Sequence, residues 1–269
     1  MVERSSRGKG KQKLLGSHQR SWLWGRNLVL ETLRAGRWPI HELLLANDLP
    51  ADLKASVHAE AVERRLVVRM ENRDVLERLA HTSEHQGFLA KMGEFPYSTV
   101  DDLLGSSGPA PLLLVLDSIQ DPYNFGAMLR SARAFGVDGV IIGGSRQVPV
   151  TSMVARSSAG VINRVKIARV DDLAVSVESL RERSIRVLGA AGTGTTSLAH
   201  SDLRGPTAIL IGNEGAGVSR ELLALCDATV SIPLDCEVES LNAAAAAAVF
   251  FYEARRQRGE GTGQGTIQR

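Results

Sequence analysis

The stretch "LLLVLD", Leu112 to Asp117, is a continuous apolar run that ends at a carboxylate. Runs of this kind, without alternating polar residues, are typical of strands buried on both faces of a parallel sheet. Similar runs recur further along the chain, with helical stretches between them: "GVIIGG" from Gly139, "RVKIARV" from Arg164, "IRVLGAA" from Ile185, "TAILIGN" from Thr207 and "ATVSIP" from Ala228. The alternation predicts an α/β domain over residues 112–258, with a mainly parallel sheet covered by helices on both faces.

A smaller α/β unit is predicted upstream, over residues 21–97. Its helix and strand signals alternate, beginning with the helical stretch "NLVLETLRAG", which stops at Gly36. The remaining signals are "HELLLA" (strand), "ADLKASVHAEAVERR" (helix), "LVVRM" (strand), "NRDVLERLA" (helix) and "GFLAKM" (strand). Turn formers dominate "GSSGPAP", Gly105 to Pro111, so we expect residues 98–111 to link the two domains.

Both ends of the chain have the composition of flexible segments. Residues 1–20 are rich in Gly, Ser and Gln and hold several Lys and Arg residues against Glu3 alone. This pattern predicts a disordered basic arm, which either binds the phosphates of a nucleic acid or is simply a solvated tail. Residues 259–269 are rich in Gly, Thr and Gln and are expected to form a flexible tail.

The overall composition indicates a globular protein that works in the cytoplasm. The chain has 269 residues, 43% of them hydrophobic, and a net charge of only +2. Its two cysteines form no CxxC pair, which argues against a disulfide framework or a zinc site. The first twenty residues have no apolar core of a signal peptide, and the longest apolar helix stops at Glu253, short of the ~20 residues that a bilayer needs. We therefore expect no membrane and no metal partner.

Loops beyond the strands' carboxyl ends are where such folds bind ligands. The loop after Asp117 leads into a helical stretch with Asn124 and Arg130, which either face one pocket or are a helix cap and a surface cation. The second loop, "IGNEGAGVS", is glycine-rich around Glu214, and its GxxGxG spacing fits neither a P-loop nor the dinucleotide fingerprint. A nicotinamide- or nucleotide-dependent enzyme is therefore disfavoured.

The third loop leads from "SIPLDCEVE" to an alanine-rich helix. Ser240 is its predicted N-cap, and Asn242 is expected in the first turn. The alanine run from Ala243 to Ala248 is strongly helical, but helix propensity alone does not explain its length. It indicates either a tightly packed core helix or a helix whose N-terminal turn faces a bound cofactor.

The three loops together resemble a known family. "NFGAMLRSARAFG", "AILIGNEGAGVS" and "SIPLDCEVESLNAAAAAAVFFYE" resemble the signature motifs of the SpoU/TrmH branch of the SPOUT RNA methyltransferases. With "GRNLVLETL" from Gly25 and "HQG" at His85 to Gly87, the resemblance covers residues 22–258 and is nearest to bacterial 23S rRNA guanosine 2'-O-methyltransferases. It implies an RNA substrate-binding domain, a C-terminal trefoil knot, S-adenosyl-L-methionine as cofactor, and a homodimer with active sites near the interface.

The resemblance also implies roles for individual residues. Arg130 would be a fixed cation that lowers the pKa of a ribose 2'-hydroxyl and stabilises the alkoxide, since a guanidinium stays protonated. Asn124 would orient the ribose or Arg130, and Glu214 would hold Arg130 or nearby backbone. The residues expected to contact the cofactor are Gly189, Gly212, Asn213, Gly217, Ile232, Ser240, Leu241 and Asn242.

The substrate implied by the resemblance is RNA, first of all a guanosine of large-subunit rRNA. The alternatives are a tRNA ribose, an rRNA site that confers antibiotic resistance, or an RNA-binding relative that has lost catalysis. His85 and Arg26 are secondary candidates for RNA contact, and Arg156 matches a stretch near the active site.

Overall fold

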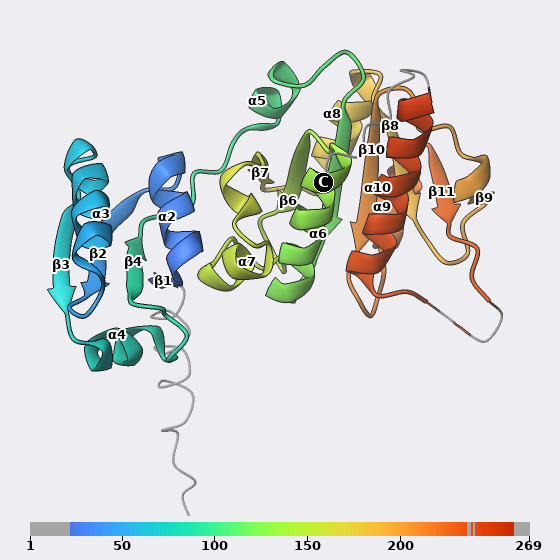
Figure 1. Cartoon of the computed structure of the whole chain (residues 1–269). Coiled ribbons are helices and arrows are strands. Elements are labelled where there is room, and N and C mark those ends of the chain that lie inside the picture. Colours follow the sequence, from blue (N-terminus) through green and yellow to red (C-terminus); the bar gives the residue numbers. More distant parts are fainter. Residues whose placement is uncertain (1–21, 236–237, 239, 261–269) are drawn as a thin grey trace, which may run out of the picture. The chain divides into compact units, whose positions relative to one another are not determined.

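Residues 22–235, 238 and 240–260 are described by the computed structural model, and they divide into two compact units (Figure 1). The first unit comprises residues 22–96 together with a returning segment, Val150–Asn163. The second unit comprises Tyr97–Pro149 and the chain from Arg164 onward. The sequence pattern had grouped residues 150–163 with the parallel-sheet domain.

The first unit is built on a four-stranded sheet with the strand order β1-β4-β2-β3. Strands β2 and β3 are parallel, whereas β4 pairs antiparallel with both β1 and β2. The strands are β1 (Trp22–Trp24), β2 (Ile40–Ala46), β3 (Val67–Glu71) and β4 (Phe88–Met92). The helices are α2 (Arg26–Ala35), α3 (Ala51–Glu63), α4 (Arg73–Ala80), α7 (Ser152–Ser157) and the 3₁₀ helix η1 (Val161–Asn163). All helices and strands predicted for residues 21–97 are confirmed, and β1 is an addition.

The returning segment is part of the core of the first unit. Helix α7 packs against β1, and η1 packs against α2. The buried Asn163 donates its Nδ2–H to Thr32 Oγ1 on α2, at 3.0 Å. At the C-terminal end of the same helix, Gly36 takes the left-handed conformation, with φ 62°, and its N–H donates to the carbonyl of Thr32. The predicted stop at Gly36 is therefore confirmed.

The second unit contains a seven-stranded sheet in which every pair is parallel, with the order β7-β6-β5-β10-β8-β11-β9. Its strands are β5 (Leu112–Asp117), β6 (Gly139–Gly143), β7 (Ile167–Val170), β8 (Arg186–Ala190), β9 (Thr196–Ser197), β10 (Thr207–Gly212) and β11 (Ala228–Ser231). The predicted parallel sheet is confirmed, and only the two-residue β9 is new. Central strands β5 and β10 run in register from Leu112↔Thr207 to Asp117↔Gly212, so the loops that follow them start side by side.

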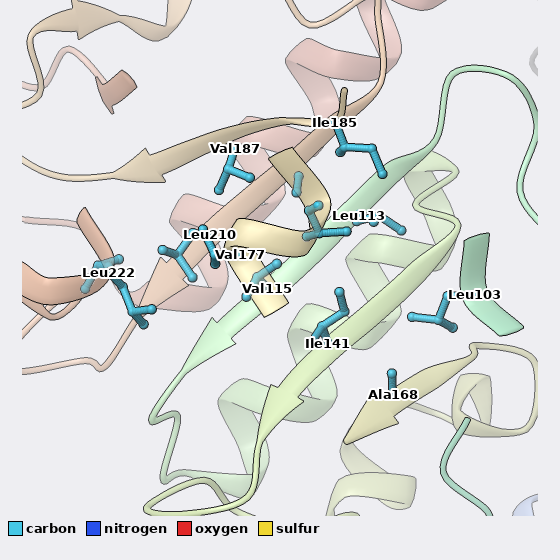
Figure 2. Close-up of a cluster of buried hydrophobic side chains, with 13 residues drawn as sticks. Leu103, Leu113, Val115, Ile141, Ala168, Val177, Ile185, Val187, Leu210 and Leu222 are labelled. Carbon is cyan, nitrogen blue, oxygen red and sulfur yellow. The ribbon is translucent and has the colours of Figure 1, made fainter. Parts of the chain in front are cut away.

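Helices cover both faces of this sheet. They are α5 (Val100–Gly105), α6 (Pro122–Phe135), α8 (Leu173–Glu182), the 3₁₀ helix η2 (Leu198–His200), α9 (Arg220–Leu225) and α10 (Ala243–Glu260). Leu113 and Val115 of β5 point into a buried cluster that α8 and α9 close from one side (Figure 2). On the other face, α6 and α10 pack against each other (Figure 1).

The expected linker between the domains contains helix α5. Thr99 and Asp102 form a capping box at its N-terminus, and these hydrogen bonds hold the pKa of the Asp102 carboxyl below its usual range. Leu103 is fully buried in the cluster shown in Figure 2. This part of the linker is therefore an ordered element of the second unit.

Helix α10 begins differently from the sequence prediction. Its first residue is Ala243, and Asn242 Oδ1 accepts hydrogen bonds from the N–H groups of Ala244 (2.9 Å) and Ala245 (3.3 Å). Asn242 is therefore the N-cap, and the predictions of Ser240 as cap and of Asn242 inside the first turn are wrong. An asparagine caps as well as a serine, and Asn242 is the residue whose side chain reaches the free N–H groups.

The other end of α10 is held by a half-buried arginine. Arg258 donates to the carbonyl oxygens of Leu203 (2.8 Å), Ala110 (2.7 Å) and Gly205 (2.7 Å). Neighbouring Gln257 accepts from Leu203 N–H at 2.8 Å and donates to Ser201 at 2.9 Å. These contacts tie the last turn of α10 to the chain just before β5 and β10.

Replacing Arg258 with alanine should lower the free energy of unfolding by about 2–4 kcal/mol, because several carbonyl groups lose a charged donor. Urea unfolding followed by far-ultraviolet circular dichroism measures this. Arg204→Ala is the matched control, because that side chain is 67% exposed and its ion pair with Asp202 spans 3.7 Å, so we expect a loss below about 1 kcal/mol. Equal losses in the two variants would show that Arg258 does not hold the helix.

Candidate functional site

The site lies in the second unit, where β5 and β10 end. Asp117, the last residue of β5, is buried and accepts the backbone N–H of Ser219 at 2.8 Å through Oδ2. Its Oδ1 accepts the hydroxyl of Ser118 at 2.8 Å. The carboxylate at the end of "LLLVLD" therefore fixes the far end of the glycine-rich loop that follows β10.

The glycine-rich loop is closed by its own hydrogen bonds. Asn213 and Gly217 exchange both backbone bonds, at 3.0 and 2.9 Å, and Asn213 Oδ1 accepts from Gly215 N–H at 2.9 Å. A Cβ on Gly212 would overlap the backbone of Gly217 and Val218, and Gly217 has φ 68°. The glycines of the GxxGxG spacing are therefore needed for a tight turn in which two backbone segments are in direct contact.

A chain of hydrogen bonds joins the three predicted motifs. Asn242 Nδ2 donates to Asn124 Oδ1 at 3.0 Å, and Asn124 Nδ2 donates to Glu214 Oε1 at 3.0 Å. The other oxygen of Glu214 accepts Asn213 Nδ2 at 3.2 Å. We refer to Asn242, Asn124, Glu214 and Asn213 as the amide–carboxylate chain. Glu214 therefore positions Asn124 and does not bind Arg130.

A cavity of about 260 Å³ opens beside this chain. Its walls combine glycine-rich backbone with the apolar side chains of Ile232, Leu241 and Phe250. The predicted residues that line it are Gly212, Asn213, Glu214, Gly217, Ile232, Ser240 and Leu241. Backbone N–H and C=O groups next to apolar side chains suit a ligand with a flat ring and a polar rim.

The remaining predicted residues lie outside the cavity lining. Asn124 and Asn242 do not line the cavity, but the hydrogen bonds of the amide–carboxylate chain connect them to Glu214, which does. Arg130 is exposed on α6 and has no hydrogen-bond or ion-pair partner among the described residues. The structure of this chain therefore does not bring Arg130 to the other candidate residues.

Gly189 lies behind the cavity wall. A Cβ there would meet Leu223 Cδ2 at 2.7 Å and Cys226 Sγ at 3.0 Å, so the glycine makes room for α9. Burial raises the pKa of the Cys226 thiol to about 11, and the side chain is therefore a neutral part of the packing.

Several cavity-lining residues were not predicted. They are Ala190, Ala191, Gly192, Gly215, Ala216, Val230, Leu234, Ala243, Ala246 and Phe250. The rule that ligands lie beyond the carboxyl ends of strands would have found Ala190–Gly192, because β8 pairs with β10. Ala243 and Ala246 belong to the alanine run, and their small side chains form the wall at the N-terminal turn of α10.

His85, a secondary candidate for RNA contact, lies in the first unit and is only 2% exposed. Its Nδ1 accepts the N–H of Gly87 at 3.0 Å, and burial lowers the pKa of the imidazole. The ring is a neutral part of the turn before β4, so the side chain that was predicted to contact RNA is not exposed on the surface of this unit. Arg26, by contrast, is exposed.

The residues that the structure describes contain no group of three or more His, Cys, Asp or Glu side chains arranged to hold a metal ion. Among the same residues, no helix combines the length and the apolar character needed to cross a membrane.

Two family models match the chain. Residues 111–252 match the SpoU rRNA Methylase family. Residues 22–98 match the RNA 2'-O ribose methyltransferase substrate-binding domain. The match covers both sheet-containing units and confirms the resemblance seen in the motifs.

Individual relatives agree with these models. A Bacillus subtilis protein named as a TrmH-family tRNA/rRNA methyltransferase is 33% identical over 245 residues, which cover 90% of this chain and 98% of that protein. The SpoU methyltransferase AviRb of Streptomyces viridochromogenes, solved with the cofactor AdoMet, superposes with a TM-score of 0.78 and 28% identity over 96% of this chain and all of that one. An AdoMet-bound rRNA methyltransferase of Sinorhizobium meliloti gives a TM-score of 0.75 and 26% identity, covering 95% of this chain and 97% of that one.

The predicted cofactor, S-adenosyl-L-methionine, is confirmed for the family by the AdoMet-bound structures. The predicted α/β fold, with a substrate-binding domain before the parallel sheet, is confirmed as well. This chain is a methyltransferase and belongs to the SpoU rRNA methylase family.

Proposed function

We propose that this protein transfers a methyl group from S-adenosyl-L-methionine to the 2'-hydroxyl of a ribose in RNA, first of all at a guanosine of large-subunit rRNA. The observation that carries the proposal is the amide–carboxylate chain, which holds the three motif loops together beside one cavity. The match of residues 22–98 to a ribose methyltransferase substrate-binding domain supports the choice of the ribose hydroxyl.

The cavity fits the cofactor by its chemistry. The loop from Gly212 to Gly217 offers backbone groups to a polar rim, and Ile232 and Leu241 offer an apolar surface to adenine. Ala243 and Ala246 have small side chains, so α10 leaves room for the cofactor on this side of the cavity. When bound, the cofactor supplies a methyl group on a positively charged sulfur, which is electrophilic without any metal.

The protein must then make a ribose hydroxyl nucleophilic. An exposed guanidinium without a partner, such as that of Arg130, is free to meet the substrate and to stabilise the developing alkoxide. Asn124 is held by Glu214 on one side and Asn242 on the other, so its amide is a fixed point against which a ribose can be oriented. The hydroxyl proton passes to water or to a phosphate of the RNA.

We further propose that the protein acts in the cytoplasm as a homodimer through the outer face of α6 and α10. This face exposes Tyr123 (60%), Val249 (38%) and Tyr252 (57%) next to the small side chain of Ala245. Tyr252 stacks edge-on against Phe135 of α6, with ring centroids 6.1 Å apart. Exposed aromatic and apolar side chains on a surface of small residues are typical of helix interfaces. A trefoil knot in the second unit stays a prediction.

Other substrates remain candidates: a tRNA ribose, or an rRNA site whose methylation gives antibiotic resistance. Purified protein and methyl-labelled S-adenosyl-L-methionine are incubated with bulk rRNA and with tRNA, and the digested nucleosides are identified by mass spectrometry. Label in 2'-O-methylguanosine from rRNA supports the proposal. Label in tRNA alone or on a base would contradict it, and no label would favour an inactive RNA-binding relative.

Arg130→Ala should lower methyl transfer by about 10²–10³-fold, because the substrate loses an electrostatic stabiliser. Cofactor affinity, measured by titration calorimetry, should stay within a few-fold. Arg204→Ala, an exposed arginine before β10 at the opposite edge of the sheet from the cavity, is the control and should leave turnover unchanged. Near-normal turnover of the Arg130 variant would remove this residue from the mechanism.

Ala246→Trp should weaken cofactor binding, because the indole would fill part of the cavity that Ala246 lines. Overpacking typically costs about 1–3 kcal/mol, or roughly 5- to 150-fold in the dissociation constant. The control is Ala245→Trp, at an exposed position outside the cavity; it should spare cofactor binding and, if α10 forms the dimer interface, weaken the dimer in sedimentation velocity. Unchanged cofactor affinity in the Ala246 variant would contradict the assignment of the cavity.

The predicted basic arm, residues 1–20, lies outside the described residues. Its deletion should weaken RNA binding and flatten the dependence of affinity on salt, because each lost phosphate contact changes the log–log slope by about 0.7–0.9. Filter binding of rRNA at several salt concentrations measures the slope. An unchanged slope would show that the arm is a solvated tail.

A further inference from the structure

The turn between β5 and α6, residues 118–121, has a strained backbone. Ser118 is not a glycine, yet its φ is 62°, in the left-handed region. Such a conformation is costly for a residue with a Cβ and persists only where surrounding contacts fix it. The turn ends at Asp121, whose side chain caps α6 by accepting the N–H groups of Tyr123 and Asn124. The conformation of the turn therefore determines where α6 begins.

One side of the turn is fixed by contacts with the glycine-rich loop and with the end of β5. The carboxylate of Asp117 accepts the hydroxyl of Ser118 at 2.8 Å. Asn213 Nδ2 donates to the backbone carbonyl of Ser118 at 2.9 Å. These contacts hold the first residue of the turn, and the next residue, Ile119, is held from the other side.

That other side is fixed by a buried glutamine in the loop after β6. Gln147 is 9% exposed, and its Oε1 accepts the N–H of Ile119 at 2.9 Å. The following residue, Val148, donates its N–H to the carbonyl of Ile119 at 2.8 Å. Gln147 Nε2 donates to the carbonyl of Val148 at 3.3 Å, which sets the orientation of the amide. Because Ile119 is fully buried, loss of the Gln147 oxygen would leave a buried backbone N–H without its acceptor.

Helix α6 carries Arg130, the cation of the proposed mechanism. The helix is continuous from Pro122 to Phe135, so a shift of its first turn would also move the guanidinium. A displacement of about 1 Å at a reacting centre can lower a rate by about 100-fold, even when its cause lies far from the chemistry. The hydrogen bond between Gln147 and Ile119 therefore bears on the rate of methyl transfer.

The cofactor cavity is built from other elements. Its lining residues come from the ends of β8, β10 and β11, from the loops after these strands, and from α10. Without the Gln147 oxygen, Asn124 would still bind Glu214 and Asn242. Loss of this oxygen should therefore lower the catalytic rate much more than it lowers cofactor affinity.

We propose that Gln147 is a positioning residue for methyl transfer, which holds the turn before α6 and thereby the place of Arg130. The proposal rests on the proposed function, which gives Arg130 its role. The sequence alone does not single out Gln147, because its partner Ile119 lies 28 positions earlier in the chain.

The test compares Gln147→Met with Gln257→Met in the full chain. Methionine has nearly the length of glutamine but offers no strong donor or acceptor. Gln257 is the matched control, because it is 6% exposed and also binds backbone groups, the Leu203 N–H and the Ser201 carbonyl. These groups precede β10 and lie at the opposite end of that strand from the cavity. Bulk rRNA with methyl-labelled S-adenosyl-L-methionine gives kcat, and titration calorimetry gives the dissociation constant of the cofactor.

We expect Gln147→Met to lower kcat by about 10- to 100-fold, with the dissociation constant of the cofactor within about threefold of wild type. Gln257→Met should leave both quantities within about threefold. Gln147→Glu keeps an oxygen for the Ile119 N–H and should recover most of the lost turnover. Should Gln147→Met fail to fold, Gln147→Asn takes its place, because its amide is one methylene too short to reach Ile119.

Three results would overturn the proposal. The first is near-normal kcat in Gln147→Met, and the second is an equal loss of kcat in Gln147→Met and Gln147→Glu. The third is a loss of kcat that Gln257→Met shares, or that a parallel loss of cofactor affinity accompanies, since either would indicate general damage to the fold.

Hydrogen–deuterium exchange, measured by mass spectrometry, tests the anchor without relying on activity. In Gln147→Met, residues 118–125 should exchange at least about fivefold faster, as expected for the loss of one hydrogen bond. In Gln257→Met their exchange should not change. Faster exchange in Gln147→Met, together with a wild-type protein that methylates no RNA, would reject only the proposed function. Methyl transfer by the wild type, with unchanged exchange and turnover in Gln147→Met, would reject only the positioning role.

Discussion

The side-chain amide of Asn124 is the contact on which the arrangement of the site depends. Its nitrogen donates to Glu214 and its oxygen accepts from Asn242, so the orientation of the amide is fixed. These partners come from the loop after β10 and from the cap of α10, while Asn124 itself stands in the first turn of α6. One residue therefore connects the ends of three separate stretches of chain. The bond to the Glu214 carboxylate is charge-assisted, and because both bonds are exposed to solvent, each contributes about 0.5–1.5 kcal/mol.

Backbone packing places these loops close enough for that contact. The register of β5 and β10 brings Asp117 beside Gly212, and the carboxylate of Asp117 then holds Ser219 at the far end of the glycine-rich loop. Gly212 lies against the backbone of Val218, and a Cβ on Gly194 would come within 2.5 Å of the backbone N of Ser231. The alanine run continues this pattern, since Ala243 and Ala246 form a wall of the cavity and Ala247 is fully buried. Small residues occur where chain segments or a ligand must approach closely.

Much of this could be predicted from local patterns. Buried strands such as "LLLVLD" and the stop at Gly36 follow from composition and backbone preference, and the structure has them where they were expected. The rule that ligands gather beyond the ends of parallel strands selected the three loops, and the family resemblance named Glu214, Ile232 and Leu241 in them, which line the cavity. The motifs also named Asn124 and Asn242, although local rules alone left open whether Asn124 faces a pocket or caps the helix at the surface.

The features that local patterns did not reveal share a physical origin in long-range packing. The return of residues 150–163 to the first unit depends on contacts such as Asn163 with Thr32, which no periodicity reveals. Strand β1 has only three residues, too short for an alternating pattern. His85 looked like a surface ligand because its burial depends on the turn before β4. Ser240 and Asn242 are both good caps, and only the position of the first helical N–H groups decides between them.

A double-mutant cycle that moves the negative charge from Glu214 to Asn124 tests the central claim most directly. The quantity measured is the dissociation constant of S-adenosyl-L-methionine, by titration calorimetry. Asn124→Asp sets a carboxylate against Glu214 and should weaken binding by at least about tenfold. The double variant, Asn124→Asp with Glu214→Gln, restores a donor opposite the new carboxylate and leaves an oxygen for Asn213. It should recover most of the lost affinity, with a coupling free energy of about 1–3 kcal/mol. If the effects of the two substitutions simply add, the site does not depend on this contact, and the account is contradicted.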